Sequence, residues 1–515
     1  MKRYIVFIFF VIVFCRYSWG QREGHIWLFS DYTGLDFNSG VAIPVLSKVH
    51  PIQSSGGRLH TATYSDARGN LKFYENLVLP DFPGFVGIYD KNDSLIKGPD
   101  FSGIIPYDVD KRFDTRFLPF RGTHKTAYVY IDIDPPRSTL NFIMLSDTIQ
   151  NGLGGVWDDS VKIISRDSLV PWGLGCVRHA NGRDWWIVTH EFLSDTFVTA
   201  LFTPDTAFVV HKQSIGTYQG VFSSTYTSGG GGGVIKFDKS GDKMLRANGE
   251  RLLETYDFDR CTGLLSNLKI ISPAYATWGH LDAEFSPNGE YIYTTTYDSI
   301  LGNTRRNRIY QFDLSISDLN INNILIDSAH ASNGFQTAAI FYLARSLDNK
   351  IYVTVFCDIG CPRDSMYLSV IQEPDKKGLN CNFQFNGLYM GGMKVGGFGL
   401  PHHPDYTIGP IDGSPCDTLG LDEYPPIVYS TSSLQASPVF EVYPNPANDN
   451  ITITGKENIR FVRLYSALGQ EVLYAQPEDE FTLQQNISVA GLESGIYFLE
   501  VAWDGGMYRS KIQVE

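Results

Sequence analysis

The 515-residue sequence predicts an almost entirely β-stranded protein, and two features of its composition carry the prediction. Aromatic residues make up 14% of the chain, with 33 Phe, 29 Tyr and 8 Trp, and such residues favour pleated strands. The 49 Gly and 25 Pro favour frequent turns. With 43% hydrophobic residues the chain can bury a large core, which excludes wholesale disorder, a collagen-like chain and a coiled coil.

The formal net charge is −14, from 42 Lys and Arg against 56 Asp and Glu. A chain of this charge lacks the basic footprint of a nucleic-acid-binding protein, and an anionic membrane surface would repel it. We therefore expect neither nucleic acid nor a membrane surface as a partner.

Residues 1–20 have the pattern of an export signal. Lys2 and Arg3 precede the apolar run 4–14, and Ser18 and Gly20 supply small residues for cleavage. The run is too short to span a membrane, which takes about 20 residues, so no membrane span is expected. Export would place the remaining six cysteines in an oxidising compartment, where disulfides form. Several pairings are open, and Cys357 and Cys361 are close enough for a local staple.

Residues 21–420 repeat one hairpin: an apolar strand, a polar turn and an aromatic strand. Its turn positions, 48 to 60 residues apart, are Gly69, Gly122, Gly182, Gly241, Gly289 and Asn349. A period of this length suits four-stranded blades that bury their faces against one another, which predicts a β-propeller. Six turn positions are visible, and residues 26–29 and 397–401 are left to share a closing blade. We therefore expect six or seven blades, with the N-terminal strand paired into the last one.

The hairpin at residues 283–293, AEFSPNGEYIY, resembles that of WD-repeat-like and lactonase-like propellers. The opening Trp27-Leu28-Phe29 and the later Gly399-Leu400-Pro401 resemble secreted propellers that are joined to a sorting domain. These motifs imply a fold and no activity. Lactonase-like propellers usually carry an Arg-His pair ahead of the hairpin, and Leu281 and Asp282 stand there instead.

A second pattern begins after a linker rich in Pro, Ser and Thr at 421–438. Residues 439–515 predict a small β-sandwich of short strands separated by turns. The expected strands are 440–443, 450–454, 460–466, 471–474, 481–489, 495–503 and 508–514.

Three motifs in this segment, VYPNPA at 442–447, LYSALGQ at 464–470 and GLESGIY at 491–497, resemble the C-terminal sorting domain of the Bacteroidetes type IX secretion system. The resemblance implies export to the periplasm, passage through the outer-membrane translocon, and release or attachment at the cell surface. Within the motifs, Pro444 and Pro446 are expected to hold an extended entry to the first strand and Asn445 to favour a turn. Gly469 and Gly495 are expected to supply positive φ at tight turns, and Tyr497 belongs to the third motif.

The strongest candidate site is the segment His280–Glu284. On a regular strand His280, Asp282 and Glu284 share one face, and in a propeller this strand would be innermost, beside the central channel. A histidine between two carboxylates could bind a ligand or perform acid–base chemistry. The pair His402-His403 favours a closing loop, because neighbours on a strand face opposite ways. The sequence identifies no catalytic residue, no metal ligand and no cofactor.

The sequence therefore predicts a signal peptide at 1–20, a β-propeller at 21–420, a linker at 421–438 and a sorting domain at 439–515. The expected function is a secreted or surface cargo of the type IX machinery that binds a glycan or a protein without catalysis. The alternative is a lactonase-like propeller hydrolase or lyase with its site at the channel mouth.

Overall fold

The chain divides into two compact units, Met1–Glu423 and Tyr424–Glu515, in a computed structural model. The structure describes residues 22–29, 32–47, 49, 62–77, 86–96, 112–134, 137–157, 161–170, 173–218, 234–247, 252–272, 280–300, 304–317, 322–328, 338–357, 366–393, 395, 400–419, 421, 440–466, 471–477, 479, 482–503 and 506–515. The predicted signal peptide lies outside these residues.

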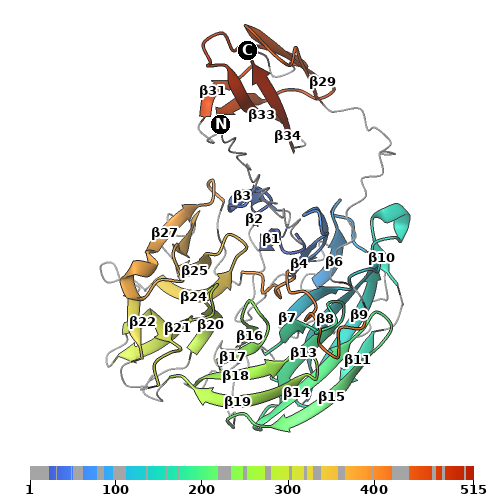
Figure 1. The fold of residues 1–515 in the computed structure, drawn as a ribbon, viewed down its shortest axis with the longest axis vertical. Coiled ribbons are helices and arrows are strands. Elements are labelled where there is room, and N and C mark those ends of the chain that lie inside the picture. The colour runs from blue at the N-terminus through green and yellow to red at the C-terminus, as the bar shows by residue number, and fades with distance from the viewer. Residues whose placement is uncertain are drawn as a thin grey trace, which may run out of the picture. The chain divides into compact units, whose positions relative to one another are not determined.

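The described part of the first unit consists of seven antiparallel sheets (Figure 1). The first two sheets contain β1 (Ile26–Phe29), β2 (Thr33–Asp36) and β3 (Ile43–Leu46), and β4 (Thr63–Ser65), β5 (Leu71–Leu77) and β6 (Val86–Asp90). The third contains β7 (Arg112–Pro119), β8 (Lys125–Asp134), β9 (Arg137–Ser146), β10 (Gly155–Val156) and β11 (Lys162–Ser165). The fourth contains β12 (Gly175–Arg178), β13 (Trp185–His190), β14 (Thr196–Phe202) and β15 (Ala207–Ser214).

The fifth sheet contains β16 (Val234–Phe237), β17 (Lys243–Ala247), β18 (Leu253–Asp259) and β19 (Leu264–Ile270). The sixth contains β20 (His280–Phe285), β21 (Tyr291–Ile300), β22 (Thr304–Asp313) and β23 (Ile324–Ser328). The seventh contains β24 (Ala338–Arg345), β25 (Ile351–Cys357), β26 (Tyr367–Ile371) and β27 (Phe383–Tyr389). Helical structure in the described residues is confined to two 3-10 turns, η3 (Gln150–Gly152) and η5 (Gly378–Cys381). The prediction of an all-β protein is confirmed.

The six turn positions read from the sequence all have positive φ, from 58° at Asn349 to 84° at Gly69. Each joins the first strand of a sheet to the second. Because L side chains rarely adopt this conformation, glycine or asparagine is needed there. The hairpin period in the sequence therefore corresponds to the repeating unit of the fold.

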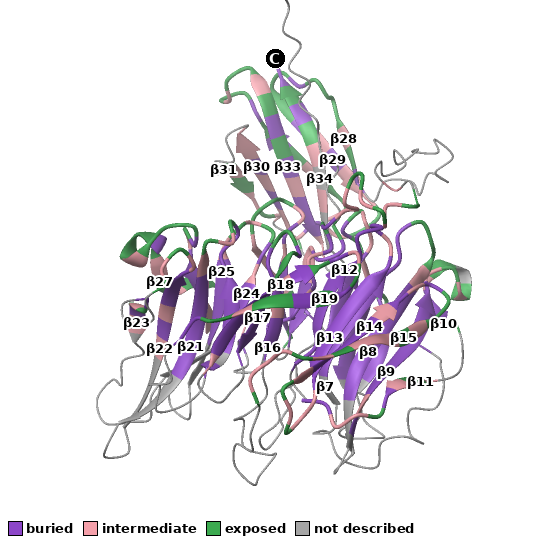
Figure 2. Ribbon diagram, turned by 60° about the horizontal axis from the view of Figure 1, so that its bottom comes forward, coloured by how far each residue is buried: buried purple, intermediate pink, exposed green. Residues whose placement is uncertain are grey.

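The strands of the sheets are largely buried (Figure 2), and neighbouring sheets share hydrophobic clusters. These clusters join the second and third sheets, the third and fourth, the fourth and fifth, the fifth and sixth, and the sixth and seventh. A further cluster joins the first sheet to the last, where Trp27 and Phe37 meet Tyr352 at ring-centroid distances of 6.1 and 5.9 Å. A succession of antiparallel sheets that bury their faces on one another is a β-propeller architecture.

One expectation about the ends of this unit is wrong. The N-terminal strand β1 does not pair into the last sheet; it pairs with β2 along Ile26–Phe29 and Thr33–Asp36. The chain reverses directly after β1, so the nearest strand becomes its partner. In the described residues the first and last sheets meet through side chains rather than through backbone hydrogen bonds.

The second unit contains two antiparallel sheets. One has β28 (Phe440–Tyr443), β29 (Asn450–Gly455) and β32 (Gln484–Ser488) in the order β28-β29-β32. The other has β30 (Phe461–Ser466), β31 (Glu471–Ala475), β33 (Gly495–Trp503) and β34 (Gly506–Val514) in the order β31-β30-β33-β34. Side chains of both sheets form one hydrophobic core, with Ile451 and Ile487 from the first and Val462 and Leu499 from the second. Across both units, the described residues include no helix long and apolar enough to cross a membrane.

Candidate functional site

The first strands of the sheets lie side by side in the first unit. β12, β16, β20 and β24 neighbour one another in turn, as do β1, β4 and β7. Charged residues of β7, β16, β20 and β24 project toward their neighbours and form the candidate site.

Lys236 of β16 is at the centre of one charged cluster. Its Nζ lies 3.1 Å from Asp282 Oδ1 and 3.2 Å from Glu284 Oε2, and it donates a 2.6 Å hydrogen bond to the carbonyl of Leu343. Asp282 Oδ2 also accepts the backbone N–H of Leu343 at 2.8 Å. Burial opposes the charge of Lys236, but the two carboxylates outweigh it and raise its pKa. The cluster joins the inner strands of three consecutive sheets.

A second cluster lies on β7. The guanidinium of Arg116 donates to Asp114 and, at 3.1 Å, to the carbonyl of Leu174. Asp114 Oδ2 accepts the backbone N–H of Leu174 at 2.8 Å, as Asp282 does with Leu343. Burial raises the pKa of Asp114, against the influence of Arg116. In both clusters an inner-strand aspartate thus binds the backbone at the start of a neighbouring sheet.

The structure brings Asp282 and Glu284 together and separates His280 from them. The pairing of β20 with β21 shifts in register between His280 and Asp282, and such a bulge interrupts the alternation of side chains. Thr294 stands opposite Ala283, so its side chain lies on the Ala283 face, and there it hydrogen bonds to His280 at 3.0 Å. His280 also hydrogen bonds to Ser272 at 3.0 Å. The expectation that all three residues share one face is therefore wrong for His280, which is buried between sheets.

Residues 401–407 form a loop that completes the site. His402 Nε2 lies 3.7 Å from Asp282 Oδ2 and its Nδ1 lies 3.9 Å from Asp114 Oδ1, so the ring bridges the two clusters. Asp405 Oδ2 lies 3.8 Å from Arg345 Nη2 of β24. A cavity of about 90 Å³ is lined by His402, Asp405 and Arg345 together with Glu284, Arg116 and Lys236. The expected closing loop thus enters the site, and because it is not a strand both histidines face inward.

Burial controls the titration of the groups around this cavity. His403 hydrogen bonds to Thr63 at 3.0 Å and packs beside Trp27, and burial lowers its pKa to about 3. Burial also raises the pKa of Cys176 to about 12. At neutral pH His403 is therefore uncharged and Cys176 is a thiol, which is a poor nucleophile.

The arrangement is that of an ion-pair network. Its charged groups are nearly balanced, with four carboxylates (Asp114, Asp282, Glu284, Asp405) against three cations (Arg116, Lys236, Arg345). In the part of the chain that the structure describes, no group of three His, Cys, Asp or Glu could hold a metal ion. The chemistry most readily open to the cavity is binding of a small polar group.

Sequence reasoning missed Lys236, Asp114, Arg116 and Arg345. One signal was present for Lys236, because it stands five residues before its turn position Gly241, as Glu284 stands five before Gly289. Aligning the hairpins on their turns would have placed the two opposite charges at equivalent positions on adjacent inner strands.

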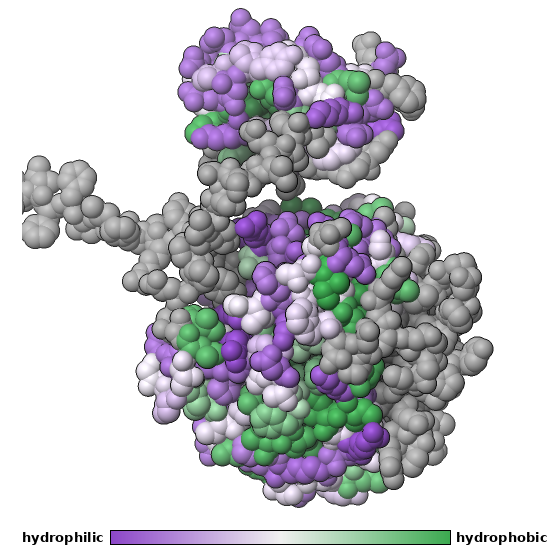
Figure 3. Space-filling view, turned by 90° about the vertical axis from the view of Figure 1, so that its right-hand side faces the viewer, coloured by the Kyte–Doolittle hydropathy of each residue, from purple (hydrophilic) through white to green (hydrophobic). Residues whose placement is uncertain are grey.

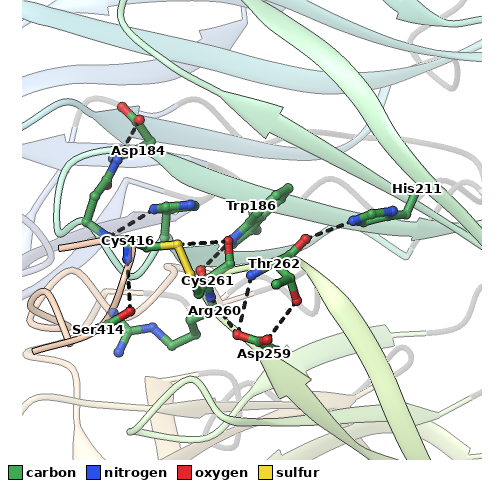
Figure 4. Close-up of a disulfide and its surroundings, with 11 residues drawn as sticks. Asp184, Trp186, His211, Asp259, Arg260, Cys261, Thr262, Ser414 and Cys416 are labelled. Carbon is green, nitrogen blue, oxygen red and sulfur yellow. Dashed lines mark hydrogen bonds between the residues drawn. A yellow bond between two sulfur atoms is a disulfide. The ribbon is translucent and has the colours of Figure 1, made fainter. Parts of the chain in front are cut away.

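A segment that we call the strap, residues 400–419, begins at this cavity and includes one cysteine of the disulfide that Figure 4 shows. Arg121 donates to the carbonyls of Tyr406 and Ile408 at 3.1 and 2.9 Å, and Ile411 N–H donates to Ala180 O at 2.9 Å. Near the end of the strap, Cys416 is bonded to Cys261 in the turn after β18. Cys176 and Cys381 are free and buried. Cys361 of the expected local staple lies outside the described residues.

In the second unit the Pro-Asn-Pro motif lies after the first strand β28, and not at its entry as expected. Asn445 donates to the carbonyl of Lys511 at 2.8 Å and accepts the N–H of Gln513 at 2.9 Å. Pro444 and Pro446 flank it, and Ala447 N–H then donates to Gln513 O at 2.8 Å. The motif therefore ties the chain after β28 to the last strand, β34.

Of the glycines in the other two motifs, Gly495 differs from expectation. Gly495 is the first residue of β33 and does not have positive φ, and a Cβ there would meet atoms no closer than 3.8 Å. The expectation of a tight turn at Gly495 is wrong, because the strand begins at this residue. Tyr497 is buried and its hydroxyl donates to Glu493 O at 2.8 Å, while Gly469 lies outside the described residues.

Part of the chain matches a known family of protein domains. Residues 441–515 match the family model of the secretion system C-terminal sorting domain. No curated protein matches the chain. Among solved structures the chain is similar to a candidate 6-phosphogluconolactonase from Bacteroides uniformis, with 13% identity, a TM-score of 0.40, and coverage of 70% of this chain and 93% of that one. It is also similar to the Swd1 β-propeller domain of Myceliophteria thermophila, with 10% identity, a TM-score of 0.37, and coverage of 65% and 94%. Likeness at this level carries no argument about activity.

The family match and the three motifs agree on the second unit. Residues 441–515 are a type IX secretion C-terminal sorting domain, joined to a unit of β-propeller architecture, and this marks the protein for secretion or export to the cell surface.

Proposed function

We propose that this protein is a type IX cargo that crosses the periplasm, reaches the cell surface or the medium, and there binds a glycan or a protein without catalysis. The proposal divides the chain into a signal peptide at 1–20, a seven-bladed propeller at 21–420, a linker at 421–438 and a β-sandwich sorting domain at 439–515. Support for seven blades comes from the seven sheets of the described residues.

The observation that supports a non-catalytic role is that Asp282 and Glu284 are both bound by other groups of the protein. Asp282 and Glu284 both contact Lys236, and Asp282 also accepts two backbone N–H groups, from Ala283 and Leu343, at 2.8 Å. A carboxylate held in this way has its oxygens occupied by the protein's own donors, which leaves it poorly placed to reach a substrate. His280, the remaining candidate, bonds to Ser272 and Thr294 instead.

The cavity supports one alternative function. Glu284, Arg345 and His402 line the same small space, and a hydrolase or lyase could place a carboxylate beside a cation in this way. Under this alternative Glu284 is the residue that the reaction needs.

Turnover assays on lactones and glycosides separate the two functions. Purified full-length protein is compared with Glu284→Gln, with His280→Ala, and with Lys239→Met, an exposed position on the β16–β17 hairpin. The proposed function predicts no turnover by any of the four proteins. The hydrolase or lyase would be established if the wild type and Lys239→Met turn over a substrate and Glu284→Gln does not, while Glu284→Gln unfolds like the wild type.

A further inference from the structure

The two sheets of the second unit present different outer faces. On the β28-β29-β32 sheet the side chains opposite the core are mostly polar, with Tyr443 as the one exposed ring among the described residues; the polar ones are Glu441, Asn450, Thr452, Thr454, Gln484, Asn486 and Ser488. Thr452 and Asn486 hydrogen bond across the strands at 2.8 Å. Seen from the side on which Figure 1 draws β29, the unit is largely hydrophilic (Figure 3). This is the ordinary outer face of a sheet that has one buried side.

The β31-β30-β33-β34 sheet has an outer face of another kind, which we call the aromatic face: Phe461, Arg463, Tyr465, Tyr474, Ile496 and Phe498. Strand pairing places Arg463 opposite Tyr474 and Tyr465 opposite Phe498. Tyr474 and Phe498 are each 50% exposed and Ile496 is 42% exposed. Large apolar groups therefore lie together in water on neighbouring strands.

The core of the unit does not require these side chains. The residues that alternate with them, Val462, Leu464, Leu499 and Val501, point to the other side and are fully buried. Serine or threonine would satisfy the outward positions, as on the other sheet. Clustered exposed aromatics that folding does not use mark an interaction surface.

Cations are interspersed with the aromatic groups. The Arg463 guanidinium lies 4.7 Å from the ring centroid of Phe461 and 5.6 Å from that of Tyr474. Exposed Lys511 stands directly opposite Phe498 on β34, while Glu500 stands opposite Arg463. Residues 441–515 as a whole carry 5 Lys and Arg against 11 Asp and Glu, a net charge of 5 − 11 = −6. Cations placed on the aromatic face of an acidic unit favour an acidic partner.

We propose that the secretion machinery binds this protein through the aromatic face, and that the partner is a protein surface with apolar pockets flanked by carboxylates. Tyr, Phe and Arg are the residues enriched at the centres of protein interfaces, and a cation on an aromatic ring matches an acidic rim. The inference rests on the proposed function and adds the face and the chemistry of the partner.

The test expresses full-length variants in a bacterium that has a type IX secretion system and measures the fraction exported. The variant Tyr474→Ser/Phe498→Ser removes the two most exposed rings of the aromatic face, and the matched control Leu483→Ser removes a group that is 49% exposed ahead of β32. We expect export to fall at least fivefold for the double variant and to stay near wild type for the control. Normal export of the double variant would overturn the inference.

A charge variant keeps the test decisive if the serine variant folds poorly. Arg463→Gln/Lys511→Gln retains the apolar groups and removes two cations, and exposed Lys456→Gln is its control. We expect the same fivefold loss for the double variant alone, with urea midpoints unchanged, and normal export of that variant would contradict the inference.

Deletion of residues 439–515 separates the inference from the proposed function. If the deleted chain is exported normally, the proposed function itself fails. If the deleted chain is retained while both double variants are exported, only the inference fails. Two further outcomes would overturn the proposal if both double variants are exported normally. Self-association of the wild type in sedimentation that the double variants lose would assign the face to a second copy. Binding of the wild type to lipopolysaccharide vesicles that the double variants lose would assign the face to a lipid.

Discussion

Replacement of Lys236 by Met should destabilise the first unit strongly. The substitution removes the ammonium group between Asp282 and Glu284 and preserves most of the side-chain length. The two carboxylates, whose side chains are 0% and 7% exposed, are then left facing each other without a cation. Removing one partner of a buried ion pair costs about 3–5 kcal/mol, mostly as the penalty for the charge left behind. We expect a loss of this size in the free energy of unfolding.

The assay is equilibrium urea unfolding at pH 7, followed by fluorescence of the tryptophans buried in the first unit, Trp27, Trp185 and Trp186. Lys239→Met is the control, because Lys239 is exposed, and it should change stability by less than about 0.5 kcal/mol. The triple variant Lys236→Met/Asp282→Asn/Glu284→Gln should recover much of the loss, since no unpaired charge remains. A Lys236→Met protein as stable as the control would refute the assignment of this cluster as a structural ion-pair network.

Three further predictions follow from the contacts described. Stability should fall by about 2 kcal/mol as the pH is lowered from 7 to 5, because burial holds the pKa of His403 at about 3 in the folded protein while the unfolded chain takes up a proton near the ordinary value of 6.5. His403→Gln should reduce the slope of urea stability against pH, whereas exposed His124→Gln should not. Cys261→Ser/Cys416→Ser should lose up to about 5 kcal/mol, since the disulfide spans 155 residues, and dithiothreitol should lower the thermal midpoint of the wild type but not of this variant. Asn445→Ala should destabilise the second unit by about 1–3 kcal/mol because it removes two hydrogen bonds to β34, whereas Gly495→Ala should be nearly neutral. Equal urea midpoints for the two variants would contradict the geometry at both positions.

Local patterns account for the parts of this fold that the sequence predicts well. The turn glycines and Asn349 are visible because a positive φ restricts which residue fits, so the hairpin period can be read directly. The strands of the second unit are equally legible, since short alternating runs are bounded by turn residues. Both signals depend on neighbours in the sequence.

Contacts between distant residues account for what the sequence does not reveal. A one-residue bulge after His280 moves that side chain to the opposite face, and strand periodicity cannot anticipate it. Lys236 meets Asp282 only because β16 lies beside β20, and Cys261 meets Cys416 only because the strap returns to β18. Such pairings are fixed by the packing of sheets, which no local pattern encodes.

The most direct test of the central claim, that the second unit carries the address for export, is to transfer that unit to another protein. A monomeric reporter is given residues 1–20 at its N-terminus and residues 421–515 at its C-terminus, and cells with a type IX secretion system are fractionated. We expect the reporter to reach the outer surface or the medium, while the same reporter with residues 1–20 alone stays in the periplasm. A reporter with residues 421–515 that remains in the periplasm would show that the second unit does not carry the address.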